Sequence, residues 1–180
     1  MRLIILDRDG VINEDSDEFI KSASEWVPIP GSLEAIARLN RADYRVVVAT
    51  NQSGIARGLL DLDVLNDIHQ QMYRALAEVG GHIEAVFFCP HGPDEHCSCR
   101  KPAPGLLQDI AKRLRTDLNG IPAVGDSIRD IQAARAVGAQ PLLVRTGKGA
   151  STAEQLKGSD DVLIFDDLVN VVDYLLSDEV

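Results

Sequence analysis

Two carboxylates lie close together near the start of this 180-residue chain, in the stretch LDRDGVIN. Asp7 and Asp9 directly follow a short apolar run, and two acids so close repel each other and resist burial. A divalent cation such as Mg²⁺, which takes oxygen ligands, offsets that repulsion. The other interpretation is a surface turn, because Asp-Gly is common in turns. The similar motif GDSIRD, with Asp126 and Asp130, also follows an apolar run, and this match favours the cation site.

The residues near these acids suit phosphoryl transfer. One carboxylate can attack phosphorus and form an aspartyl phosphate, and a second can protonate the leaving oxygen and then activate water. The transferring group spreads its charge over its oxygens and needs donors and cations around them. The hydroxyl of Thr50, the backbone amides of Asn51 and Gln52, and the amine of Lys101 are candidates for that role.

All three cysteines lie in the polar loop CPHGPDEHCSCRKP, residues 89–102. A clustered, odd number of cysteines argues against a disulfide framework and for a metal. Zn²⁺ prefers tetrahedral thiolate and imidazole ligands, and a closed site of four is structural. His96 could compete for the imidazole position but fits the spacing less well. Three buried cysteines without metal would be expected in apolar sequence. We therefore expect a structural zinc site formed by Cys89, His91, Cys97 and Cys99.

The segments that must position these residues alternate between strand-like and helix-like patterns. Apolar runs predict strands at 3–6, 44–50, 83–89, 121–126, 141–146 and 162–165. Helical spacing predicts helices at 32–42, 61–78, 104–116, 128–138, near 152–157 and at 167–177. Repeated strand–helix units with continuously apolar strands predict an α/β fold, a doubly wound parallel sheet with helices on both faces. Ligands in such folds gather at the carboxyl ends of the strands, where the polar motifs lie.

The chain resembles the haloacid-dehalogenase superfamily of phosphatases. The motifs DRDGVIN, TNQSG, CRKP and GDSIRD match the four motifs of that superfamily in order, and the likeness runs from residue 3 to about 149. It implies a Rossmann-like sheet. The gaps where the superfamily often inserts a cap domain are too short here to hold one. We therefore expect a single capless domain over residues 1–180, with a zinc loop at 89–99 after the third strand.

The resemblance also implies a role for each motif residue. Asp7 corresponds to the nucleophile and Asp9 to the general acid and base. Thr50 and Lys101 correspond to the residues that orient the phosphate. Mg²⁺ would be held by Asp126, the side chain of Asp7 and the backbone carbonyl of Asp9.

Within the superfamily the chain is similar to capless phosphatases that carry a zinc loop. For these the resemblance implies a small phosphorylated sugar, a heptose 1,7-bisphosphate of bacterial cell-surface synthesis that loses its C7 phosphate. It implies substrate contacts by Thr50, Asn51, Gln52, Ser53, Arg100 and Lys101. The alternative is a histidinol-phosphate phosphatase, whose cationic substrate better suits the acidic DSDE at 15–18. The paired cations of CRKP favour the bisphosphate.

Three positions have no assigned role at this stage. Ser127 occupies a position where a lysine is common in the related phosphatases. Arg57 and Lys148 could contact phosphate or be ordinary surface charges.

Net charge and hydropathy limit the classes of molecule that this protein can bind. The net charge of −10 disfavours nucleic acid and anionic membranes, and any phosphate must meet a local cluster of cations. No apolar run approaches the roughly 20 residues that span a bilayer, and the N-terminus lacks a signal-peptide pattern. We expect a cytoplasmic protein that acts as a monomer.

Overall fold

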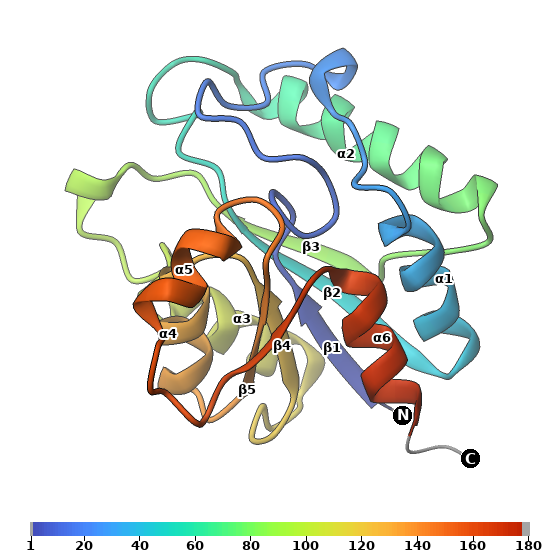
Figure 1. Cartoon of the computed structure of the whole chain (residues 1–180). Helices are drawn as coiled ribbons and strands as arrows, with labels where there is room; N and C mark the ends of the chain where they lie inside the picture. The colour runs from blue at the N-terminus through green and yellow to red at the C-terminus, as the bar shows by residue number, and fades with distance from the viewer. Residues whose placement is uncertain (1, 178–180) are drawn as a thin grey trace.

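Six parallel strands form one sheet in residues 2–177, the part of the chain that this computed structural model describes (Figure 1). The strand order β3-β2-β1-β4-β5-β6 is that of a doubly wound fold. The predicted fold class is therefore confirmed. The strands are β1 (Arg2–Leu6), β2 (Tyr44–Asn51), β3 (Ala85–Cys89), β4 (Pro122–Gly125), β5 (Gln140–Val144) and β6 (Leu163–Phe165).

Helices cover both faces of this sheet (Figure 1). They are α1 (Ser32–Arg41), α2 (Leu62–Glu78), α3 (Gly105–Leu114), α4 (Ile128–Ala136), α5 (Gly149–Gln155) and α6 (Leu168–Ser177). Side chains alternate across β1: Ile4 and Leu6 pack in the apolar core with α1, α2 and α6, whereas Leu3 and Ile5 pack in the core with α3 and α4. Two apolar layers thus hold β1 at the centre of the sheet.

The predicted strands and helices all exist, with bounds that differ by a few residues. The largest shift is in α5, which begins at Gly149 and not near residue 152. A side chain at Gly149 would collide with the backbone, because a Cβ there would lie 1.6 Å from the carbonyl oxygen of Val144. The chain therefore turns into the helix directly after β5, at a position that only glycine can occupy.

Long connections at the carboxyl ends of β1 and β3 carry two of the polar motifs, DRDGVIN and CRKP. Apart from two single-turn 3₁₀ helices, Ala23–Glu25 and Pro93–Glu95, residues 7–31 and 90–104 contain no helix or named strand. No large cap stands over this edge of the sheet within the described part of the chain. Among residues 2–177, none of the helices combines the length and apolar character needed to cross a bilayer.

Candidate active site

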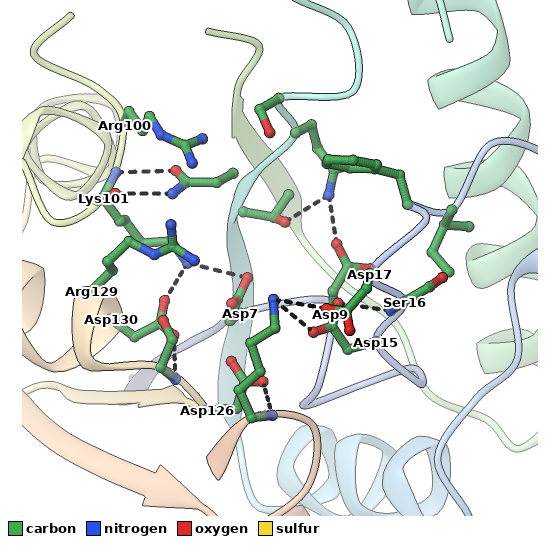
Figure 2. Close-up of a pocket in the computed structure, with 18 residues that line it drawn as sticks. Asp7, Asp9, Asp15, Ser16, Asp17, Arg100, Lys101, Asp126, Arg129 and Asp130 are labelled. Atoms are coloured by element: carbon green, nitrogen blue, oxygen red, sulfur yellow. Dashed lines mark hydrogen bonds and ion pairs between the residues drawn. The ribbon is translucent and has the colours of Figure 1, made fainter. Parts of the chain in front are cut away.

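A cavity of about 160 Å³ opens at the carboxyl ends of the strands (Figure 2). Strands β1, β2 and β4 and the loop before α3 deliver its polar side chains, although their motifs are far apart in the sequence. The predicted catalytic, substrate-binding and magnesium-binding residues all line it: Asp7, Asp9, Thr50, Asn51, Gln52, Ser53, Arg100, Lys101 and Asp126. Asp15, Ser16, Asp17, Ser127, Arg129, Asp130 and Lys148 complete its polar lining.

Three carboxylates lie together at the base of the cavity, and two of them, Asp7 and Asp126, are predicted Mg²⁺ ligands. Single oxygens of Asp7, Asp126 and Asp130 all lie within 4.8 Å of one another. Burial, together with the charge of Asp130, raises the pKa of Asp126 to about 7. Burial also raises the pKa of Asp7, and Lys101 only partly offsets this. A divalent cation would remove this repulsion, so the donor set fits Mg²⁺.

The backbone holds the Asp126 carboxylate in place from several sides. Its Oδ2 accepts a hydrogen bond of 2.8 Å from the amide of Lys148. Gly10 and Gly147, both at positive φ, pass so close that a Cβ on either would lie within 2.2 Å of the same oxygen. Both positions therefore require glycine, for conformation and for space. One carboxylate oxygen of Asp126 is thus oriented before any ligand arrives.

Lys101 is buried between two acids. Its Nζ lies 3.1 Å from Oδ1 of Asp7 and 2.5 Å from Oδ1 of Asp130, and it donates to the carbonyl oxygen of Ala49 at 2.8 Å. Burial opposes its charge, but Asp130 and Asp7 outweigh that cost and hold its pKa above the ordinary value. Asp130 also accepts bonds from the Ser127 amide and hydroxyl at 3.0 and 2.6 Å. It therefore anchors both the lysine and the start of α4.

The side chain of Asn51 is committed to the backbone of Lys101. Its Oδ1 accepts from the Lys101 amide at 3.0 Å, and its Nδ2 donates to the Lys101 carbonyl at 3.0 Å. This paired contact joins the end of β2 to the CRKP segment across fifty residues of sequence. Asn51 lines the cavity as predicted. Its side-chain amide is bonded to the backbone of Lys101 and so positions that lysine.

Asp9 is held by Arg8, a fully buried arginine. Nε of Arg8 donates to Oδ1 of Asp9 at 3.0 Å, and Nη2 lies 2.9 and 3.1 Å from the two oxygens. Asn13 and Gln52 add bonds to the same carboxylate at 2.9 and 2.8 Å. Burial alone would raise the pKa of Asp9, but these donors lower it below its ordinary value. These contacts therefore favour the ionised form of Asp9.

A histidine on α2 supports the arginine from the other side. Nε2 of His69 lies 3.2 Å from Nη1 of Arg8. A guanidinium has no acceptor, so His69 must accept this bond through an unprotonated Nε2. Burial and the Arg8 charge lower the pKa of His69 to about 4, whereas Asp9 acts in the opposite direction.

This burial predicts a pH effect on stability. The folded pKa of His69 lies below the unfolded value of about 6.5, so between about pH 4 and 6.5 the unfolded chain binds more protons. The stabilisation from neutral His69 is present above pH 6.5 and is lost as the pH falls toward 4, by up to about 1.4 kcal/mol per pH unit. Urea unfolding at pH 5 and at pH 7 measures this loss of stability. His69→Gln keeps an acceptor but does not titrate, and should lose less stability at pH 5. Equal losses would contradict the prediction.

Thr50 and Gln52 form a second pair of polar groups at the end of β2. Nε2 of Gln52 donates to the Thr50 hydroxyl at 2.9 Å and also to Asp9. Thr50, Gln52 and Ser53 are nearly buried, so their side chains are held on the wall of the cavity. The side-chain amide of Gln52 thus links Asp9, the predicted general acid and base, to Thr50, which is predicted to orient the phosphate.

The acidic loop that follows Asn13 lies opposite the cationic residues (Figure 2). Nζ of Lys148 lies 3.4 Å from Asp15 and 3.7 Å from Asp17. This lysine compensates part of the negative charge of the loop. The acidic stretch therefore does not present a bare negative surface to a phosphorylated ligand. Arg57, in contrast, stacks over the ring of Phe19 at 5.4 Å and does not line the cavity.

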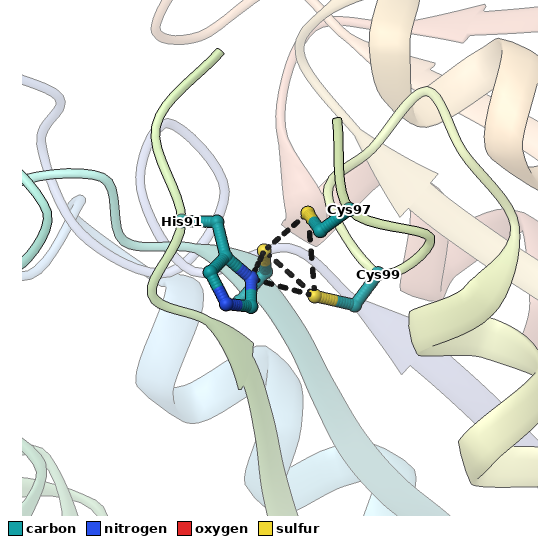
Figure 3. A group of neighbouring side chains, drawn as sticks. His91, Cys97 and Cys99 are labelled. Carbon is teal, nitrogen blue, oxygen red and sulfur yellow. Dashed lines mark hydrogen bonds between the residues drawn. The ribbon is translucent and has the colours of Figure 1, made fainter. Parts of the chain in front are cut away.

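The predicted zinc ligands come together beside this cavity (Figure 3). Nδ1 of His91 lies 3.5 Å from the sulfur of Cys89 and 3.3 Å from that of Cys99, and the sulfur–sulfur distances are 2.9 to 3.6 Å. These are too long for a disulfide bond, about 2.05 Å. Four ligands about 2.3 Å from one zinc would stand roughly 3.5–3.8 Å apart, close to most of these distances. The exposed His96 is not part of this cluster.

Metal analysis tests the cluster directly. We expect one zinc per chain that survives dialysis, whereas Mg²⁺ is loosely held and required for turnover. Cys97→Ser should lose the zinc, lower the melting temperature and reduce turnover, because the loop ends at Lys101. His96→Ala is the matched control and should keep zinc and activity. Protein without zinc by elemental analysis, together with an unchanged melting temperature in Cys97→Ser, would rule the zinc site out.

Sequence reasoning missed three residues of this region. Arg8 lies between Asp7 and Asp9 in the sequence. A buried arginine at that position must pair with one of the two aspartates. Arg129 precedes Asp130 within GDSIRD and lines the cavity. Its position within a recognised motif was a usable signal. The sequence pattern around His69 did not indicate a role in the site, because a single histidine on the buried face of a helix is usually part of the core.

The sheet order, the four strand-end motifs and the open cavity define a phosphatase of the haloacid-dehalogenase type. The HAD-hydrolase-like family matches residues 98–171. The chain is 57% identical over 99% of both chains to the D-glycero-beta-D-manno-heptose-1,7-bisphosphate 7-phosphatase of Bordetella bronchiseptica, and 56% identical over 97% of both chains to that of Pseudomonas aeruginosa. The chain belongs to this 7-phosphatase family, as the sequence motifs predicted.

Solved structures agree with this placement. A crystal structure of the D,D-heptose 1,7-bisphosphate phosphatase of B. bronchiseptica, complexed with magnesium and phosphate, superposes with a TM-score of 0.96 at 57% identity over 99% of both chains. The corresponding phosphatase of Burkholderia thailandensis gives a TM-score of 0.78 at 47% identity, over 98% of this chain and 99% of that one.

Proposed function

We propose that this protein is a Mg²⁺-dependent phosphatase that removes the C7 phosphate of D-glycero-β-D-manno-heptose 1,7-bisphosphate. The observation that carries this proposal is the cluster of Asp7, Asp126 and Asp130, in which Asp7 and Asp130 pair with one buried lysine. Relatives that match the chain over almost its full length bear that name. A buried nucleophile beside a cation site and a fixed lysine is what phosphoryl transfer needs.

In the reaction, an oxygen of Asp7 attacks phosphorus as the bond to the C7 oxygen breaks. Asp9 donates a proton to that leaving oxygen, and the phosphoryl group is then carried by Asp7 as an acyl phosphate. Asp9, now ionised, takes a proton from water, and the water oxygen attacks phosphorus to release inorganic phosphate and free Asp7. Lys101 and the Thr50 hydroxyl surround the phosphoryl oxygens and stabilise their charge.

Asp9 needs a proton for the first step, although its neighbours favour the ionised form. Gln52 donates to both Asp9 and Thr50, so it can release Asp9 and stay anchored to the threonine. Asp9 Oδ2 then keeps only the 3.1 Å contact with Nη2 of Arg8, the longest contact to this carboxylate, and can carry a proton that faces the leaving oxygen. The low pKa of Asp9 suits the second step, in which it must be ionised first.

The protein would bind two metal ions, one in the cavity and one in the loop beside it. Asp7, Asp126 and the backbone carbonyl of Asp9 would hold Mg²⁺, since the Asp9 carboxylate is occupied by Arg8. Bound there, Mg²⁺ supplies positive charge to the phosphoryl oxygens. Zinc in the Cys89, His91, Cys97 and Cys99 cluster would be structural, because four protein ligands leave no open position.

The bisphosphate is favoured over histidinol phosphate. The bacterial relatives reported above act, by name, on the heptose bisphosphate. In addition, Lys148 compensates part of the negative charge of the acidic loop, which weakens the argument for a cationic substrate.

A phosphate-release assay tests the proposal. Purified protein with Mg²⁺ is given either anomer of heptose 1,7-bisphosphate, or histidinol phosphate, at equal concentrations. We expect the highest kcat/KM for the β anomer and release of one phosphate, with heptose 1-phosphate as the product. Preference for histidinol phosphate, or release of the C1 phosphate, would overturn the proposal.

A further inference from the structure

The guanidinium of Arg8 is held between two side chains that are far apart in the sequence. Its Nε and Nη2 face the Asp9 carboxylate at 2.9 to 3.1 Å, and its Nη1 lies 3.2 Å from Nε2 of His69. Within residues 2–177, Asp9 and His69 are the polar partners of this fully buried group. The guanidinium is therefore fixed from two sides, by the acid on one and by the histidine on the other.

His69 is the polar residue on an otherwise apolar helix face. The other buried residues of α2 pack in the apolar core and are Leu65, Ile68, Met72 and Leu76. If an apolar side chain stood in place of His69, Nη1 of Arg8 would lose its acceptor, and water could not replace it because Arg8 is not exposed. A buried donor without an acceptor is costly, so Arg8 would have to move. His69 thus determines where the guanidinium lies.

The two oxygens of the Asp9 carboxylate are held unequally. Oδ1 accepts three bonds of 2.9 to 3.0 Å, two from Arg8 and one from Asn13. Oδ2 accepts a bond of 2.8 Å from Gln52 and has a longer contact of 3.1 Å with Nη2 of Arg8. Oδ1 has no capacity left for a further partner. Oδ2 is therefore the oxygen that must meet the leaving group.

The position of the Arg8 side chain determines this difference between the oxygens. The backbone of Arg8 is fixed, since its carbonyl accepts bonds from the amides of Ile12 and Asn13 at 2.8 and 3.2 Å. The side chain has several rotatable bonds, and a shift of its guanidinium would turn the Asp9 carboxylate with it. A misplacement of about 1 Å, even one caused far from the chemistry, can cost 100-fold in rate. The contact with His69 prevents such a shift.

We propose that His69 is a positioning residue for the acid–base steps, because through Arg8 it holds the Asp9 carboxylate with Oδ2 toward the leaving oxygen. This rests on the proposed function and adds to it a residue of α2 that does not line the cavity. His69 accepts a hydrogen bond and exchanges no proton. Its loss therefore slows the steps that need Asp9, whereas the attack by Asp7 on phosphorus is unchanged.

Two substrates that differ in their need for an acid test this inference. The rate of the first turnover is measured with heptose 1,7-bisphosphate and with nitrophenyl phosphate, whose leaving group needs little protonation. His69→Leu should lower the rate for the bisphosphate about 10- to 100-fold and that for nitrophenyl phosphate by less than about threefold. His69→Gln keeps an acceptor and should stay within about threefold of the wild type for both substrates.

A stability control separates positioning from a general loss of structure. Leu76→Ala changes a fully buried residue two turns further along α2. It should lower the melting temperature, as His69→Leu does, but leave both first-turnover rates within about twofold of the wild type. Should His69→Leu not fold, His69→Ala is compared under the same criteria.

A double variant shows whether His69 acts through Arg8. In Arg8→Lys, a single nitrogen replaces the fork and cannot bond Asp9 and His69 as the guanidinium does, so the loss should again be confined to the bisphosphate. Adding His69→Leu should then lower the rate by less than about twofold more.

Three results would overturn this inference and leave the proposed function intact. They are an equal loss with both substrates in His69→Leu, a His69→Gln protein no faster than His69→Leu, and independent losses in the double variant. Wild-type protein that does not release the C7 phosphate of the bisphosphate would overturn the proposed function as well, so the two failures are distinguishable.

Discussion

Asp7→Asn is expected to reduce turnover by about 10³- to 10⁶-fold, the range found when a catalytic nucleophile is removed. An amide is a poor nucleophile, and direct attack by water would lack a base placed for it. Single-turnover kinetics with labelled heptose bisphosphate measure the loss. The wild type should carry labelled phosphate on the protein within one turnover, and the variant none.

The fold should survive this substitution. Lys101 keeps its contact with Asp130 at 2.5 Å, and the change removes one of three carboxylates that repel each other. We therefore expect the Mg²⁺-free variant to be at least as stable as the wild type in urea. Asp63→Asn, an exposed change on α2, is the control and should leave turnover unchanged. A folded Asp7→Asn protein with near-normal turnover would refute the covalent mechanism.

The second large effect is expected for Asp9→Asn, at about 10²- to 10⁴-fold in turnover of the heptose bisphosphate. The variant can neither protonate the leaving oxygen nor activate water. A substrate with a good leaving group separates these steps. Nitrophenyl phosphate needs little protonation, so the variant should release a burst of about one nitrophenolate per chain and then turn over slowly, because the phosphorylated Asp7 is not hydrolysed.

Arg8 complicates this variant, and stability must be measured beside activity. Asparagine offers one acceptor where aspartate offers two, so the fully buried guanidinium of Arg8 loses part of its partner. Leaving a buried charge unpaired costs about 3–5 kcal/mol, and we expect a clear fall in the urea midpoint. Rates are therefore compared well below that midpoint. Equal loss with both substrates and no burst would show that Asp9 mainly holds Arg8 in place and is not the acid.

Local pattern was enough to predict the elements and the order of the motifs. Continuous apolar runs identified the six strands, and the polar residues at their ends identified the edge of the sheet where a site belongs. The cluster of Cys89, His91, Cys97 and Cys99 could also be predicted, because all four residues lie in one short loop and their spacing limits the geometry. These features depend on neighbours in sequence, which periodicity and spacing report directly.

Only the tertiary structure decided which charges pair. Asp9 could have faced the cation with Asp7, but Arg8 and His69, sixty-one residues apart, hold its carboxylate away. The Asn51 side chain is bonded to the Lys101 backbone, a contact that the sequence did not predict, and Arg129 was not recognised. The physical reason is that a buried polar group must find a partner wherever the packed elements place one. That partner is set by long-range packing, of which the linear sequence carries no local sign.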